Sequence, residues 1–218
     1  MNNIRIEKNV YFVRHGESED NKRPVFQSPE SPLSERGREQ ANRIAERTAH
    51  LNFEQLISSS LLRAKQTAFI VGEKTKKEAR YSDLFIERIK PTSINGKSHR
   101  DKEAVALADK WNESLFTSGL RVENGENFDD IIYRADKALD FLTNQDGKDL
   151  LVITHGFFLK TMIVRVLLGL SLTEENFKNF QSAVNMKNTG LSVLQYGRWQ
   201  EEKPLWRLWI YNDHSHLG

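Results

Sequence analysis

Short runs of apolar residues alternate along this chain with longer segments in which apolar positions recur every three or four residues. The short runs are rich in β-branched and aromatic residues, which is typical of buried strands. Strands are predicted at residues 10–13, 53–58, 150–154, 190–196 and 205–211. The periodic segments are typical of amphipathic helices. Helices are predicted at residues 34–49, 62–77, 104–115, 128–142, 157–168 and 174–180.

The order of these elements indicates the fold class. Strands that alternate with helices are typical of a sheet covered by helices on both faces. We therefore expect an α/β protein, a three-layer α/β/α sandwich with a mostly parallel central sheet. Ser34 is predicted to be the N-cap of the first helix, and residues 83–87 form a short strand or an extended run.

Two segments interrupt the alternation. Residues 19–32 contain three prolines and no periodicity, and residues 88–100 are mostly polar with Pro91 and Gly96 among them. Structureless loops of this length are uncommon as simple connections, so they favour a role at a functional site. We expect a single domain over residues 1–218, in which segments at about 20–32 and 88–118 form a lid or insertion.

Length and composition narrow the kinds of protein that the chain can be. Its 218 residues can bury a proper core, and the formal charge of +2 argues against nucleic acid as a partner. The absence of cysteine excludes disulfides, thiol nucleophiles and thiolate metal sites, and it fits a reducing compartment. Residues 2–8 lack the apolar core of a signal peptide, and residues 157–172 are too short and too charged to span a bilayer. We expect a cytoplasmic protein without a membrane partner, and a homodimer stays open.

The candidate chemistry follows two of the predicted strands. Arg14, His15 and Gly16 come directly after the first strand, and His155 and Gly156 come after the run at 150–154. Because the carboxyl ends of parallel strands meet at one edge of a sheet, the two histidines should converge. Guanidinium groups match phosphate oxygens, and a neutral imidazole nitrogen is a competent nucleophile. Cationic donors would also stabilise the charge of a phosphoryl group in transfer.

A metal site is the alternative chemistry for the same two histidines. It would need a third ligand, usually a carboxylate, and no aspartate adjoins either strand end. Arginines beside the site would also repel a divalent cation. We therefore expect neither a metal ion nor another cofactor.

Further blocks of sequence resemble the histidine phosphatase superfamily, the phosphoglycerate mutase-like proteins of branch 1. The blocks occur in the family's order at residues 14–17 (RHGE), 32–37 (PLSERG), 59–68 (SSLLRAKQTA), 125–127 (GEN), 154–156 (THG) and 188–190 (NTG). A tripeptide recurs by chance, whereas all of these blocks together are a specific signal. The resemblance covers most of the chain and implies the phosphoglycerate mutase-like sandwich, with an inserted segment over the site.

The resemblance also implies roles for individual residues. His15 would be the nucleophile that becomes phosphohistidine. Arg14, Arg63 and His155 would form the phosphate pocket, and Gly156 belongs to the same expected binding set. Arg63 lies at a predicted strand-to-helix junction, where the helix N-terminus also favours an anion.

The remaining expected site residues lie in loops. Asn21 matches a position that commonly contacts the phosphate, and Ser18 is either a hydroxyl donor to it or a turn residue. Glu87 matches the acid that protonates the leaving oxygen and later activates water. The residues after Glu87 depart from the family pattern, in which a glycine follows closely, so Asp83 and Glu126 are kept as substitute acids.

The chain is therefore predicted to be a phosphomonoester phosphatase that acts on a small phosphorylated metabolite through a phosphohistidine. One alternative is a phosphoglycerate mutase, which must shield its phosphohistidine from water. Residues 88–96 do not resemble the basic-aromatic stretch of the glycolytic mutases. The other alternative is a non-catalytic binder of a phosphorylated ligand, which would need only the cations and not His15, Glu87 and His155 together.

The predicted lid segments carry several cationic side chains. These are Lys22, Arg23, Lys90, Lys97, Arg100 and Lys102. They are either solvated loop charges or a sign of an anionic or multiply phosphorylated substrate, and the sequence favours neither interpretation.

Overall fold

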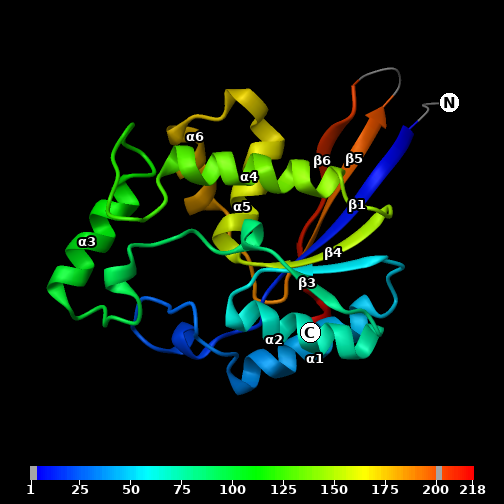
Figure 1. Cartoon of the computed structure of the whole chain (residues 1–218), viewed down its shortest axis with the longest axis horizontal. Coiled ribbons are helices and arrows are strands. Elements are labelled where there is room, and N and C mark those ends of the chain that lie inside the picture. The colour runs from blue at the N-terminus through cyan, green and yellow to red at the C-terminus, as the bar shows by residue number, and fades with distance from the viewer. Residues whose placement is uncertain (1–3, 200–202) are drawn as a thin grey trace.

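A six-stranded sheet forms the centre of the computed structural model, which describes residues 4–199 and 203–218 (Figure 1). The strands are β1 (Ile4–Arg14), β2 (Gln55–Ser58), β3 (Ala79–Tyr81), β4 (Asp149–Thr154), β5 (Leu191–Trp199) and β6 (Leu205–Asp213). They lie in the order β3-β2-β4-β1-β5-β6. The first four are parallel, and β5 and β6 are antiparallel to their neighbours. The expected mostly parallel sheet is confirmed.

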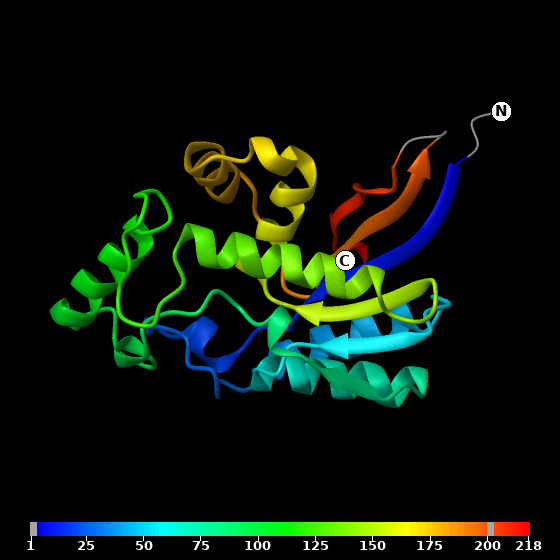
Figure 2. The same cartoon turned by 45° about the horizontal axis from the view of Figure 1, so that its top comes forward.

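Helices cover both faces of the sheet, so the three-layer sandwich is also confirmed (Figures 1 and 2). The helices are α1 (Glu35–Thr48), α2 (Leu62–Thr75), α3 (Lys102–Glu113), α4 (Phe128–Thr143), α5 (Gly156–Leu168) and α6 (Glu174–Ala183). Helices α1 and α2 pack on one face, and α4 and α5 pack on the other. Helix α3 stands apart from the sheet at the far end of the molecule (Figure 2).

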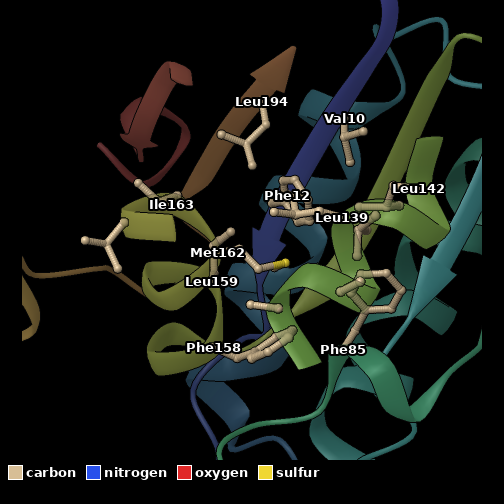
Figure 3. Packing of buried hydrophobic residues seen from close by; sticks show 14 of the residues in the cluster. Val10, Phe12, Phe85, Leu139, Leu142, Phe158, Leu159, Met162, Ile163 and Leu194 are labelled. Atoms are coloured by element: carbon tan, nitrogen blue, oxygen red, sulfur yellow. The ribbon is translucent and has the colours of Figure 1, made fainter. Parts of the chain in front are cut away.

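Alternating side chains of the central strands divide the core between the two faces. In β4, Leu150 and Val152 join the cluster under α4 and α5, while Leu151 and Ile153 join the cluster over α1 and α2. Figure 3 shows the first cluster, in which Phe12 of β1 lies among side chains of α4 and α5. Strands buried on both faces read as continuous apolar runs, which is why the sequence predicts them well.

The strand boundaries differ from the predicted ones where strands are exposed. Strand β1 begins at Ile4, six positions before the predicted start. Its first half is a partly exposed ribbon paired with β5, so no continuous apolar run marks that half in the sequence. Strand β3 is a short, largely exposed edge strand of three residues and carries no apolar run. At 83–87, Ser82 caps a 3-10 turn over Asp83–Phe85, and extended residues follow.

Helix α1 starts where its cap predicts. The Ser34 side chain accepts a hydrogen bond from the Gly37 backbone N–H at 3.0 Å. This bond satisfies one of the free N–H groups of the first turn. The cap also holds the start of α1 against the loop after β1, because the Ser34 N–H donates to the carbonyl of Glu17 at 2.9 Å.

The two segments predicted to form a lid pack against one another. Val25 forms a bridge with Ser98, and the Phe26 N–H donates to the carbonyl of Lys97. A small apolar cluster joins the segments and contains Ile94, Ala104 and Ala108, with Phe26 and Leu107 against them. Helix α3 belongs to this cluster rather than to the main core.

Within the described residues, no helix has both the length and the apolar character that crossing a bilayer requires. Residues 1–3 lie outside the described residues, and they include the first two positions of the segment 2–8, for which no signal-peptide core is expected. Of the two C-terminal tryptophans, Trp206 packs against the main core and Trp209 is 68% exposed.

Candidate active site

The two histidines meet at the carboxyl edge of the sheet. Strands β1 and β4 pair in register so that Arg14 lies opposite Thr154, and each strand is followed by its histidine. The ring centroids of His15 and His155 are 4.9 Å apart, with an angle of 56° between the rings. Both side chains are buried. The convergence that the sequence predicts is therefore present.

Backbone hydrogen bonds fix the loop that carries His15. Its N–H donates to the carbonyl of Thr154 at 2.9 Å, and its own carbonyl accepts from the Asn188 side chain at 3.0 Å. Gly16 packs so closely on α1 that a Cβ there would lie 2.4 Å from the carbonyl oxygen of Gly37. The loop can take this path only with a glycine, and the nucleophile candidate is thereby held in one place.

The His15 ring is held with its Nε2 free of a proton. Nδ1 lies 2.6 Å from the carbonyl oxygen of Gly16, so Nδ1 carries the proton and donates it. Nε2 accepts from the Nε–H of Arg63 at 3.1 Å. Burial, and after it the charges of Arg63 and Arg14, hold the pKa of His15 well below its ordinary value. A neutral imidazole with its lone pair on Nε2 is the form that can act as a nucleophile.

His155 presents a donor without an acceptor. Its Nε2 lies 2.7 Å from Ser59 Oγ, which also accepts from the Leu61 N–H at 3.2 Å. Nδ1 is buried and has no hydrogen-bond partner. Because Ser59 Oγ already accepts from the Leu61 N–H, we assign the Ser59 hydroxyl as the donor to Nε2, and this assignment places the proton of the neutral ring on Nδ1. Burial, and then the charge of Arg63, lower the pKa of His155 well below its ordinary value.

Arg14 supplies a second unpaired donor at the same edge. One terminal nitrogen donates to the carbonyl of Met186, while Nε is buried and has no partner. A Cβ on Gly156 would lie 3.1 Å from that Nε, so glycine at this position leaves room for the guanidinium. Buried polar groups are normally paired. The unpaired groups of Arg14 and His155 are of the kind that an oxyanion at this edge would satisfy.

Arg63 is the second arginine at this edge of the sheet, beside Arg14. It lies in the first turn of α2, directly after β2, and its side chain is 2% exposed. Its Nη1 donates to the carbonyl of Ser28 at 3.3 Å. Burial lowers the pKa of Arg63 to about 10, so the group is charged at neutral pH.

Glu87 lies beside the cluster at the N-terminus of α5. Its carboxylate accepts from the backbone N–H groups of Phe157 at 3.2 Å and of Phe158 at 2.9 Å. Arg134 of α4 fixes the segment that carries it, donating to the carbonyls of Leu84 and Ile86 at 3.1 and 2.9 Å. These contacts hold the carboxylate in a defined orientation.

The substitute acids are engaged elsewhere. Both carboxylate oxygens of Glu126 pair with Arg134 at 2.7 Å, and one also accepts from the Ile89 N–H. Asp83 is exposed and accepts from the hydroxyl of Ser60. Of the three carboxylates, Glu87 is the one that shares a cavity wall with Arg63.

Ser18 and Asn21 hold one another. The Asn21 side chain is exposed and accepts from the backbone N–H and hydroxyl of Ser18, each at 3.0 Å. Ser18 is buried and also accepts from Gln27. Neither side chain hydrogen-bonds to His15 or His155 within the described part of the chain, and their contact with a phosphate stays a prediction.

The described residues contain no group of three or more His, Cys, Asp or Glu side chains placed to hold a metal ion. The Arg63 N–H that donates to His15 Nε2 also occupies the nitrogen that a metal at the histidine pair would need. The residues at this edge are therefore suited to an anion.

Sequence reasoning missed several residues that build the site. Ser59 fixes the His155 ring, and Arg134 holds the segment before Glu87. Arg88 is 5% exposed, stacks 3.7 Å from the centroid of the Trp111 ring and donates to the carbonyl of Glu126. Ser59 lies in a block that resembles the family. Nothing in the sequence marks Arg88 as buried or Arg134 as partly buried, because charged residues at such positions are usually solvated.

The histidine pair predicts a pH dependence of folding in the ligand-free protein. The unfolded chain takes up protons on histidine near pH 6.5, whereas the folded site excludes them. The contribution of the two neutral histidines to the free energy of unfolding should therefore be fully present above pH 6.5. It should fall as the pH drops, by up to about 1.4 kcal/mol per pH unit for each histidine. His216, whose pKa burial lowers to about 4, acts in the same direction.

Urea unfolding between about pH 7 and pH 5.5 measures this slope. A His15→Gln variant should lose one histidine's share of it, and the exposed His50→Ala control should keep the full slope. An equal slope in His15→Gln and the wild type would show that His15 is not kept neutral by folding.

Comparisons with known proteins place the chain in a family. Residues 10–209 match the family described as "Histidine phosphatase superfamily (branch 1)". A curated relative, "Probable phosphoglycerate mutase GpmB" of Enterobacter sp. (strain 638), is 28% identical over 95% of this chain and 94% of its own length. The solved structure of Bacillus stearothermophilus YhfR aligns with a TM-score of 0.80 at 23% identity, over 97% of this chain and 100% of that one. A mycobacterial glucosyl-3-phosphoglycerate phosphatase aligns with a TM-score of 0.73 at 23% identity, over 95% and 99%.

Proposed function

The chain belongs to branch 1 of the histidine phosphatase superfamily, and we propose that it hydrolyses small phosphomonoesters through a phosphohistidine at His15. The observation that carries this proposal is the neutral His15 ring, whose Nε2 faces Arg63 beside the unpaired donors of Arg14 and His155. A nucleophile and three donors for the phosphoryl oxygens are thus present at one edge of the sheet.

The first step transfers the phosphoryl group to the protein. Phosphate oxygens accept hydrogen bonds from the N–H groups of Arg14 and His155. The Arg63 Nε–H, which donates to His15 Nε2 in the free protein, then donates to the substrate. The lone pair on His15 Nε2 then attacks phosphorus while the bond to the leaving oxygen breaks, and Glu87 gives that oxygen a proton. The proton can arrive with the substrate, because the second pKa of a phosphomonoester is about 6.

The second step returns the site to its first state. Glu87 takes a proton from a water molecule, whose oxygen attacks phosphorus as the P–N bond to His15 breaks. Inorganic phosphate leaves, and His15 again has its lone pair on Nε2. The same donors stabilise the charge of the transferring group in both steps.

Phosphoryl transfer of the mutase type is the second candidate, since the curated relative is named a probable phosphoglycerate mutase. A mutase keeps the phosphohistidine from water until a second hydroxyl accepts the phosphoryl group. The two candidates share the first step. They differ in whether water or a second hydroxyl accepts the phosphoryl group from His15.

An assay with 3-phosphoglycerate and a bisphosphoglycerate primer, in the presence of a chelator, distinguishes the candidates. We expect release of inorganic phosphate, both here and across a panel of sugar, nucleotide and amino-acid phosphates. Formation of 2-phosphoglycerate without phosphate release would instead assign the mutase reaction. If neither inorganic phosphate nor 2-phosphoglycerate forms, and an aryl phosphate is not hydrolysed, the protein would be a non-catalytic binder of a phosphorylated ligand.

A further inference from the structure

A cavity of about 220 Å³ adjoins the phosphate site and shares Arg63 and Glu87 with it. It is smaller than the roughly 300–1,000 Å³ of pockets that hold drug-sized ligands. Part of its wall is apolar and is formed by Pro29, Leu61, Ile86 and Ile89. Because Glu87 is the proposed acid for the leaving oxygen, this cavity lies where the leaving group of a substrate would sit. Its size and walls fit a short carbon skeleton.

Arg88 and Lys90 are the cations of the segment 88–118 that line this cavity. The Arg88 guanidinium already donates to the carbonyls of Glu126 at 2.9 Å and Trp111 at 2.6 Å, which leaves Lys90 as the candidate for binding a ligand. The Lys90 ammonium is half-buried and donates to the carbonyl of Gln27, which leaves two of its three N–H donors for a ligand. The other cations named in these segments are exposed, and three of them pair with carboxylates; the set is Lys22, Arg23, Lys97, Arg100 and Lys102. These pairs are Lys22 with Glu19, Arg23 with Asp20, and Lys97 with Asp101.

The charges around Lys90 leave it without a matched anion. Arg63, Glu87 and Asp20 are the charged groups that act on it. Asp20 is already bound by Arg23 and by the Ser28 N–H at 2.8 Å. In the proposed first step Glu87 carries the proton for the leaving oxygen and so offers Lys90 no charge, and the phosphoryl group matches the arginines. The charge of Lys90 then remains for a group on the leaving side of the substrate.

A second feature of the cavity indicates a polar leaving group. The Asn95 Oδ1 is buried, lines the cavity and has no hydrogen-bond partner. The neighbouring Asn124 is engaged with Thr92 by two hydrogen bonds of 2.8 and 3.0 Å. A hydroxyl or ammonium on the leaving group would satisfy Asn95, since a buried acceptor needs a donor.

We propose that Lys90 is a specificity-determining residue that binds a second anionic group, a carboxylate or a phosphate, on the leaving side of a small phosphomonoester. This inference rests on the proposed hydrolysis at His15 and names the substrate class of the same site. The anion pairs with the Lys90 ammonium on the cavity wall, while the carbon skeleton contacts the apolar part of that wall.

The pairing of the Lys90 ammonium with an anionic group should weaken as the pH rises. Burial, and then the charge of Arg63, lower the pKa of Lys90 to about 8, while Glu87 and Asp20 oppose this shift. The ammonium, and with it the preference for an anionic leaving group, is present below that pH and lost above it. A matched neutral substrate should not show this loss.

The test compares 3-phosphoglycerate with glycerol 3-phosphate, which differ only in a carboxylate against a hydroxymethyl group. Glycerol 1,3-bisphosphate tests a second phosphate in place of the carboxylate. A charge-assisted hydrogen bond in a partly buried site gives about tenfold or more, so the wild type should favour an anionic substrate in kcat/KM by that factor. Lys90→Met should abolish the preference, and Lys90→Arg should keep it even above pH 8. Lys97→Met is the matched control and should keep the wild-type ratio.

A wild-type ratio near one, or an unchanged ratio in Lys90→Met, overturns the proposal. Calorimetric binding of the same ligands to a His15→Asn variant, with and without Lys90→Met, measures the preference without turnover. If no ligand is hydrolysed but binding still depends on Lys90, the proposed hydrolysis fails and the specificity role stands. Equal dissociation constants for the charged and neutral ligands exclude the specificity role by themselves.

Discussion

A His15→Ala variant is expected to lose phosphatase activity by at least about 10⁴-fold, because the phosphoryl group then has no acceptor on the protein. The loss should appear in kcat for every substrate, including aryl phosphates with good leaving groups. Arg14, Arg63 and His155 remain in the variant, so it should still bind inorganic phosphate. Steady-state kinetics with phosphate calorimetry measure both properties.

The matched control for this experiment is His50→Ala, which removes an exposed histidine at the end of α1. It should leave kcat unchanged. Activity of His15→Ala within about tenfold of the wild type would rule out His15 as the nucleophile and with it the two-step mechanism.

A Glu87→Gln variant is expected to lose about 10²- to 10⁴-fold in kcat/KM on alkyl phosphates, which is the usual share of a general acid. The loss should be much smaller for 4-nitrophenyl phosphate, because a nitrophenolate leaves without a proton. The second step still lacks its base in this variant. Phosphohistidine should therefore accumulate with the aryl substrate, and rapid quenching at alkaline pH would detect a burst of nitrophenolate with matching phosphoprotein.

Asp83→Asn is the control carboxylate, because Asp83 is exposed and bonded to Ser60. It should behave as the wild type. An equal loss on alkyl and aryl substrates in Glu87→Gln would indicate that Glu87 only positions the start of α5, where its oxygens accept from Phe157 and Phe158.

Much of the fold follows from local patterns in the sequence. The apolar runs before His15 and His155 predict two parallel strands, and their register brings both rings to one edge. The Ser34 cap sets the start of α1 because its hydrogen bond is local. Strand β3 could not be predicted, since an exposed edge strand of three residues is held by its pairing with β2 and not by burial.

The site is less predictable where it depends on how the segments at about 20–32 and 88–118 pack against one another. Lys90 and Lys97 are both lysines in one polar loop, yet Lys90 is half-buried beside Arg63 and Lys97 is exposed. The contact of Phe26 with the Ile94 cluster decides which side of the loop faces inward. The two segments are far apart in the chain, so no local pattern carries this information.

Two arginines, Arg88 (buried) and Arg134 (partly buried), could not be recognised as such from the sequence either. Arg134 pairs with Glu126 and bonds to the segment before Glu87, while Arg88 joins that segment to Trp111 and Ser114 in the lid. Together they connect the segment around Glu87 to α4 and to the segment 88–118. Only the assembled structure shows that the two arginines are held by carbonyls and not by solvent.

The stereochemical course at phosphorus tests the central claim most directly, because it does not require the phosphohistidine to accumulate. A phosphomonoester made chiral at phosphorus with oxygen isotopes is hydrolysed in isotopically labelled water, and the configuration of the released phosphate is determined. Two successive in-line displacements, first by His15 and then by water, predict net retention. Net inversion would mean direct attack by water on the substrate and would contradict the covalent mechanism.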